Sequence, residues 1–211
     1  MVLGWAVLIP LGVLAARYFK VMPGQDWPAR LDNKAWWHAH RGLQWLGLLL
    51  AMLGLLLVLP HAGQHGAAAQ NHARLGWVLM SLAALQLLSG LLRGSKGGPS
   101  EPQLRGDHYD MTRHRIWFER LHKGLGWLLL GGSMGVIVSG LALADAPRWM
   151  GALLLLWWLA LLMLALRWQA SGRCIDTYQA IWGPDPAHPG NQRKPIGWGV
   201  RRPWESHHGR S

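Results

Sequence analysis

Five apolar runs, each close to the length of a membrane span, constrain this chain more than any other feature. They cover residues 2–19, 40–60, 74–93, 124–145 and 149–167. A helix needs about 20 apolar residues to cross a hydrocarbon layer of roughly 30 Å, and the helices of a soluble core do not need runs this long. The sequence therefore predicts an all-α integral membrane protein, a bundle of five transmembrane helices.

The first run also has the length of a secretory signal peptide. Its basic residues, Arg17 and Lys20, follow the apolar stretch, whereas a signal peptide carries them in front, and no small-residue cleavage site appears. We therefore expect residues 2–19 to form a retained helix.

The distribution of basic residues predicts the orientation of the bundle. Most of the 21 Lys and Arg residues lie between the first and second runs, between the third and fourth runs, and after the fifth run. By the positive-inside rule, the N-terminus is outside and the C-terminus is cytoplasmic. The net charge of +11 then reflects topology and contact with anionic membrane lipids, and nucleic-acid binding is not predicted.

The chain divides into one membrane domain and one tail. Residues 1–168 hold all five runs, and residues 169–211 hold a stretch, GPDPAHPGNQRKPIGWG, that is too rich in Gly and Pro to continue a helix. We expect 169–211 to be an irregular cytoplasmic tail. The single cysteine, Cys174, lies in this tail, so the sequence has no Cys-x-x-Cys-His motif for covalent haem attachment.

Two histidines open helices that start on the same side of the membrane. His40 opens the second run and His122 just precedes the fourth, so both should lie at one depth near the cytoplasmic face, while His72 should lie near the outer face. Two imidazoles from different helices are the usual axial ligands of a b-type haem. Arg41 and Lys123, each next to one of these histidines, are candidate partners of the haem propionates.

A haem between two helices needs small residues where its ring lies, and glycines on the same two helices are candidates for this role. They are Gly42, Gly47 and Gly54 on one helix and Gly124, Gly126, Gly131 and Gly132 on the other. The alternative is that the histidines are interfacial residues and the glycines are helix contacts, which would make the protein a haem-free membrane scaffold. His38 points to a different helix face from His40, and we expect it to be interfacial.

Several segments together resemble the membrane domain of the cytochrome b561 family, especially the branch attached to extracellular DOMON domains and its bacterial relatives. The segments are GWAVLIPLGVLAARYFK at 4–20, WWHAHRGLQ at 36–44, NHARLG at 71–76, QLLSGLLR at 86–93 and LHKGLGW at 121–127. The resemblance covers about two-thirds of the chain. It implies four haem-binding helices and two b-type haems on opposite sides of the membrane. Carried over, His40 and His122 bind the inner haem iron and His72 binds the outer one.

One residue of the family pattern is missing. The resemblance implies a histidine several residues before Trp5, where this sequence has no room for it. Either a histidine-containing segment precedes Met1 in the whole protein, which the short first run favours, or the protein holds one haem. His61 or His65, in the short outer loop, is a less favoured substitute.

The resemblance implies a transmembrane electron-transfer oxidoreductase. We expect a cytoplasmic-side donor, ascorbate-like or a quinol, and a bacterial inner-membrane location. With only the inner haem, the chain would be a mono-haem subunit that works with a redox partner protein. A homodimer also remains open.

Overall fold

The structure, a computed structural model, describes residues 1–61, 66–101 and 105–203. A short π-helical segment, η1 (Leu3–Leu8), continues into α1 (Ile9–Tyr18). Four long helices follow, with shorter elements between and after them. In chain order these are α2 (Ala35–Val58), η2 (Leu59–His61), α3 (Gly66–Leu91), α4 (Asp107–Asp110), α5 (Arg113–Leu143), α6 (Arg148–Ala170) and α7 (Thr177–Trp182).

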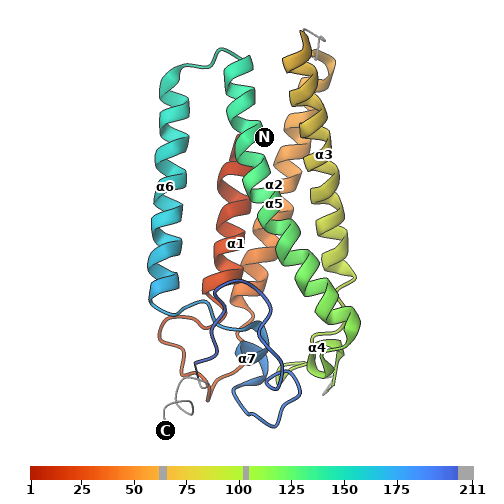
Figure 1. Cartoon of the computed structure of the whole chain (residues 1–211), viewed down its shortest axis with the longest axis vertical. Helices are drawn as coiled ribbons and strands as arrows, with labels where there is room; N and C mark the ends of the chain where they lie inside the picture. The colour runs from red at the N-terminus through yellow and green to blue at the C-terminus, as the bar shows by residue number, and fades with distance from the viewer. Residues whose placement is uncertain (62–65, 102–104, 204–211) are drawn as a thin grey trace.

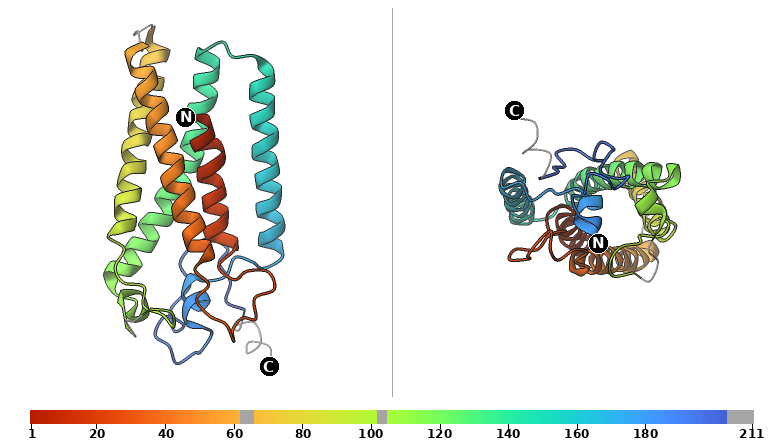
Figure 2. Two further views of the ribbon diagram at one scale, coloured as in Figure 1. Left: turned by 180° about the vertical axis from the view of Figure 1, so that it is seen from behind. Right: turned by 90° about the horizontal axis from the view of Figure 1, so that it is seen from below.

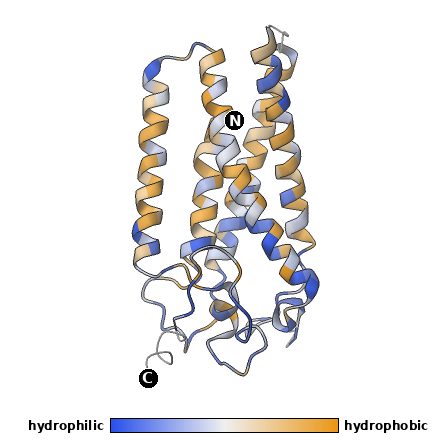
Figure 3. Ribbon diagram, viewed as in Figure 1, coloured by the Kyte–Doolittle hydropathy of each residue, from blue (hydrophilic) through white to orange (hydrophobic). Residues whose placement is uncertain are grey.

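The prediction of an all-helical membrane bundle is confirmed. Helices α2, α3, α5 and α6 are long and apolar enough to cross a membrane, and η1 with α1 forms a shorter apolar helix. Large apolar side chains such as Leu57 and Leu156 are well exposed on the outer surface of the bundle, as expected for a surface that faces lipid. Figure 3 shows this apolar surface along the helices, with hydrophilic residues gathered at the end that carries α4 and α7.

We call that end the inner end, because the charge pattern predicts it to be cytoplasmic. Two helices begin there earlier than predicted: α2 starts at Ala35 and α5 at Arg113, although their apolar runs begin near residues 40 and 124. The side chain of Thr112 caps α5 by accepting a hydrogen bond from the backbone N–H of Arg115, at 3.2 Å. His40 and His122 therefore lie within the second and third turns, and not at the helix starts.

Helix α2 packs closely along η1 and α1, and its glycines make this approach possible (Figure 1). A Cβ atom at Gly47 would lie 2.9 Å from Ile9 Cγ1, and one at Gly54 would lie 2.8 Å from Met1 Cγ. Gly47 and Gly54 were candidates for haem space, and for these two glycines that prediction is wrong. They are helix contacts, as in the alternative considered there.

Helix α3 packs against α5, and α6 stands farther from the rest of the bundle (Figures 1 and 2). The indole N–H of Trp157 on α6 donates to the carbonyl oxygen of Ala6 at 2.8 Å, which fixes α6 to η1. The N-terminus of η1 lies partway along the bundle and does not reach its outer end.

The tail is folded against the inner end of the bundle. It contains the short helix α7, which the sequence analysis did not predict, and the side chains of Cys174, Tyr178 and Ile181 are almost completely buried. Arg202 forms a buried ion pair with Asp176 at 3.1 Å, which joins the two ends of the described tail. The tail therefore forms a floor under the helices.

Candidate functional site

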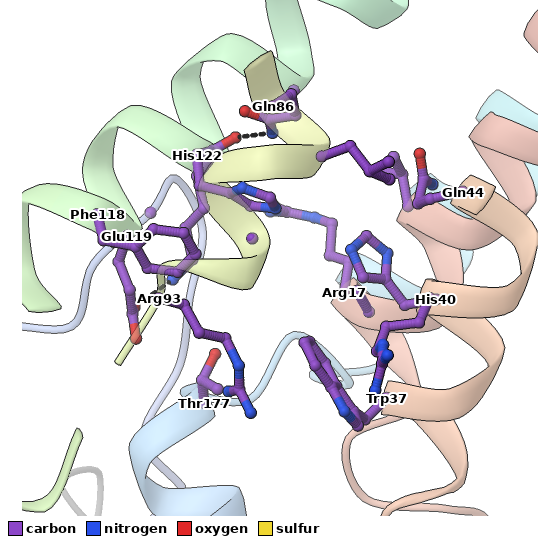
Figure 4. A pocket seen from close by; sticks show the side chains of 18 of the residues that line it. Arg17, Trp37, His40, Gln44, Gln86, Arg93, Phe118, Glu119, His122 and Thr177 are labelled. Atoms are coloured by element: carbon purple, nitrogen blue, oxygen red, sulfur yellow. Dashed lines mark hydrogen bonds and ion pairs between the residues drawn. The ribbon is translucent and has the colours of Figure 1, made fainter. Parts of the chain in front are cut away.

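The structure brings His40 and His122 together at the same depth of the bundle, as predicted. Their ring centroids are 6.3 Å apart and their planes are inclined by 74°. Figure 4 shows the two rings facing one another across a pocket, His40 from α2 and His122 from α5. This separation leaves room for one metal ion that binds a nitrogen of each ring at about 2 Å.

The hydrogen bond of His40 fixes which nitrogen is free. His40 Nδ1 lies 3.0 Å from the carbonyl oxygen of Gly12 on α1. A carbonyl can only accept, so Nδ1 carries the proton and Nε2 keeps its lone pair. Metal-binding histidines are usually held in this way, with the second ring nitrogen donating to a carbonyl. Gly12 lets α1 approach this closely, since a Cβ there would lie 3.2 Å from Leu43 Cβ.

His122 is held by its neighbours and not by a hydrogen bond to its ring. The ring packs against Phe118 at 5.1 Å, and Gln86 on α3 donates to the backbone carbonyl of His122 at 2.6 Å. Its Nδ1 is buried and has no hydrogen-bond partner among the described residues. Buried polar nitrogens normally have partners, so an imidazole without one beside a pocket is available to a ligand.

The pocket between the two rings is a cavity of about 270 Å³ lined by α1, α2, α3, α5 and the tail. Small residues widen it at two places: a Cβ at Gly90 would lie 3.9 Å from His122 Cε1, and one at Gly126 would lie 3.5 Å from Gln86 Nε2. Gly126 was among the predicted glycines, and Gly90 was not. A mostly apolar cavity with two opposed imidazoles fits a planar haem with both axial positions filled.

Basic side chains dominate the inner part of the pocket. Glu119 is the one acidic residue among those that line it, against seven basic ones: Arg17, Lys20, Arg41, Arg93, Lys96, Arg115 and Lys123. The predicted propionate partners, Arg41 and Lys123, are therefore both at the pocket. Lys123 already donates to Glu119 Oε2 at 3.0 Å and to the carbonyl of Ile196 at 2.6 Å.

His72 lies near the outer end, between α3 and α5. Its Nδ1 is 2.9 Å from Ser139 Oγ, and Ser139 uses its own hydroxyl proton to donate to the carbonyl of Val136 at 2.9 Å. Ser139 must therefore accept from Nδ1–H, which leaves His72 Nε2 with a free lone pair. Within the described ranges, no second imidazole forms a ring contact with His72, so the predicted outer site has one histidine here.

Among the described residues, the other histidine side chains do not line the pocket. His38 is exposed, and His108 is buried under the tail. His65, His207, His208 and the side chain of His61 lie outside the described residues, so the idea of a substitute ligand in the outer loop is not addressed. No cluster of three or more His, Cys, Asp or Glu suited to a metal ion occurs in the part of the chain that the structure describes.

Sequence comparison identifies relatives of one kind. The chain is 32% identical to bovine (Bos taurus) ferric-chelate reductase 1 over 117 residues, which are 55% of this chain and 19% of that protein. It is 27% identical, over 151 residues, to a cytochrome b561, DM13 and DOMON domain-containing protein of Arabidopsis thaliana, covering 72% of this chain and 14% of the relative. A second Arabidopsis thaliana protein, a cytochrome b561 and DOMON domain-containing protein, is 28% identical over 151 residues, which cover 70% of this chain and 34% of that protein.

These relatives support a membrane domain similar to that of the cytochrome b561 family. The chain corresponds to about a third or less of the length of each of these three curated relatives. No family model matches the chain, and no solved structure matches it. The similarity to this family therefore rests on these relatives. It agrees with the helical bundle and with the sequence segments quoted above for the resemblance.

Proposed function

We propose that this b561-type domain is a b-type haem membrane cytochrome that transfers electrons, with His40 and His122 as the axial ligands of a haem near the inner end. The observation that supports this most directly is the pair of opposed imidazoles, 6.3 Å apart on two helices. The bond from His40 Nδ1 to Gly12 supports it further, because it presents Nε2 to the pocket.

A bound haem would supply one-electron redox chemistry at its iron. The residues of this chain do the rest. His40 and His122 would hold the iron through one nitrogen each, which would favour electron transfer over oxygen activation. Gly90 and Gly126 leave room for the ring, and the apolar walls keep water away from it.

His72 supports a second, outer haem site in the whole protein. Its Nε2 is free in the same way as that of His40, since Ser139 accepts from Nδ1–H. A second axial ligand for this site would come from residues beyond this sequence or beyond the described ranges. Without that ligand, the domain is a mono-haem subunit that passes electrons to a redox partner protein.

The electron donor in this proposal approaches from the inner end. The seven basic residues around the pocket favour an anionic, ascorbate-like donor, while the apolar surroundings of the bundle also suit a quinol dissolved in the membrane. A bacterial inner membrane is the location that we propose for the protein, in the orientation set by its basic residues.

The pyridine haemochrome assay on purified full-length protein tests the proposal directly. We expect about one b-type haem per chain, and the untreated protein should give the low-spin absorption spectrum of an iron with two nitrogen ligands. His40→Ala and His122→Ala should each abolish the inner haem signal, while His38→Ala, which alters an exposed ring on the same helix, should leave it unchanged. Protein without any Soret band would refute the proposal and leave the haem-free scaffold.

The haem count also separates the two forms of the proposal. His72→Ala should have no effect on a chain that binds only the inner haem, and should remove one of two haems in a longer form that supplies the missing outer ligand. If His72→Ala lost the absorption of the inner haem, the assignment of His72 to a separate outer haem site would be contradicted.

A further inference from the structure

The ammonium group of Lys20 is buried at the inner end of the pocket without a carboxylate partner. The residue is 6% exposed and follows the last turn of α1. Its Nζ donates to the carbonyl oxygen of Ile175 in the tail at 2.8 Å, and among the described residues no acidic side chain lies within ion-pair distance of it. Burial, together with the charge of Lys123, lowers the pKa of Lys20 to about 8. The site therefore lacks the negative charge that a buried ammonium needs.

Arg93 presents a second uncompensated cation to the same pocket. It follows α3, is half-buried, and stacks its guanidinium over the ring of Trp37 at 4.2 Å. Within the described ranges its guanidinium has no hydrogen bond and no ion pair. Burial and the charges of Arg115 and Arg41 lower its pKa to about 10. Figure 4 shows the Arg93 side chain extending toward the side of the pocket where Trp37 and Thr177 lie.

Other cations nearby have a carboxylate partner. Arg115 and Lys123 both pair with Glu119 at 3.0 Å, and Lys96 pairs with Asp32. Lys20 and Arg93 thus carry about two positive charges that the described part of the protein does not balance. Leaving a buried charge unpaired costs several kcal/mol, so a bound anion would be strongly favoured at this place.

Thr177 completes the polar groups at this end. It begins α7 in the tail, is 8% exposed, and lines the pocket two residues after the carbonyl that holds Lys20. A hydroxyl, an ammonium and a guanidinium together suit a carboxylate, since Arg and Lys form charge-assisted hydrogen bonds and Arg can bind both oxygens at once.

We propose that Lys20, Arg93 and Thr177 form a carboxylate-binding site at the inner end of the pocket, and that its occupants are the two propionates of the haem. This inference rests on the proposed haem site. It adds three residues to the predicted pair Arg41 and Lys123, of which Lys123 already has two acceptors. A carboxylate on a small soluble donor presents the same chemistry, and the experiment separates the two sources.

The experiment titrates detergent-solubilised, full-length apoprotein with haem b and with haem b dimethyl ester, which lacks the two negative charges. Binding is followed at the Soret band. We expect Lys20→Met and Arg93→Met each to weaken the binding of haem b by about tenfold or more. We expect the same variants to bind the dimethyl ester as tightly as the wild type does. Arg93→Lys, which keeps the charge, should bind haem b more tightly than Arg93→Met.

Arg120→Met is the matched control, because Arg120 is an exposed cation on α5 outside the pocket. It should bind both haems as the wild type does. Equal affinity for haem b in the wild type, Lys20→Met and Arg93→Met would overturn the inference and leave the proposed function intact. The inference would also be overturned if haem affinity stayed constant while KM for a carboxylate donor rose. Wild type that binds neither haem would refute both proposals. If Lys20→Met does not fold, Arg93→Met and Arg93→Lys decide the question.

Discussion

Removing the buried imidazole of His108 should make the stability of the inner end less sensitive to acid. His108 lies in α4, its side chain is 1% exposed, and its ring packs against Tyr178 of α7 at 5.5 Å. Burial, and secondly the charge of Arg115, lowers the pKa of His108 to about 3, although Glu119 acts in the opposite direction. In the folded protein the ring is therefore neutral at every pH above that value.

The size of the effect follows from the difference between the folded and unfolded pKa values. An exposed histidine titrates near pH 6.5, so below this pH the unfolded chain binds one proton more than the folded chain. The stability that neutral His108 provides is complete above pH 6.5 and is lost as the pH falls toward 3. The loss is about 1.4 kcal/mol per pH unit, or roughly 2 kcal/mol between pH 6.5 and pH 5.

His108→Phe keeps the ring and removes the titration. The free energy of unfolding, measured by denaturant titration in detergent micelles at several pH values, should therefore fall less steeply with acid by about 1.4 kcal/mol per pH unit. His114→Phe is the matched control, because it replaces a nearby imidazole whose side chain is 60% exposed. Equal slopes in wild type and His108→Phe would refute the reasoning, since the buried ring would then not be the group that resists protonation.

Two further substitutions test the packing of the bundle and of the tail. Gly47→Leu should lower the free energy of unfolding by about 1–3 kcal/mol, because the new side chain would enter the space of Ile9. Gly42→Leu is the control and should cost little, because the space around Gly42 is open. Thermal unfolding in micelles compares the two variants. Arg202→Met should leave Asp176 buried without its partner, at a cost of about 3–5 kcal/mol, and should make the tail markedly easier to cleave in limited proteolysis. A tail that resists protease as well as the wild type does would contradict that role of the ion pair.

The fold and the central pair of residues could be predicted because they depend on long-range regularities of the sequence. Five apolar runs fix the number of helices, and alternating helix directions then place His40 and His122 at one level. The helix starts were misplaced because hydropathy detects only strongly apolar turns. Helix α2 begins with the aromatic turn AWWH, while α5 begins with the basic turn RHRI behind a cap at Thr112.

The contacts that complete the site could not be predicted, because they join segments distant in the sequence. Lys20 and Arg93 each follow a helix end, and nothing near either residue indicates that a tail more than 80 positions later encloses it. In the sequence, Gly47 and Gly126 are both glycines within an apolar helix. In the structure, Gly47 contacts η1 and α1, while Gly126 faces the pocket. Only the packing of the helices distinguishes a glycine that admits a neighbour from one that leaves space.

The position of the tail has a consequence for how the protein is made. Cys174, Thr177 and Ile181 line the inner side of the pocket, yet they are synthesised after all five helices. While the helices insert, the pocket is open on that side, and docking of the tail closes it. A cofactor that enters from the inner side has its widest access before the tail docks, and loading of the finished protein from that side requires the tail to detach.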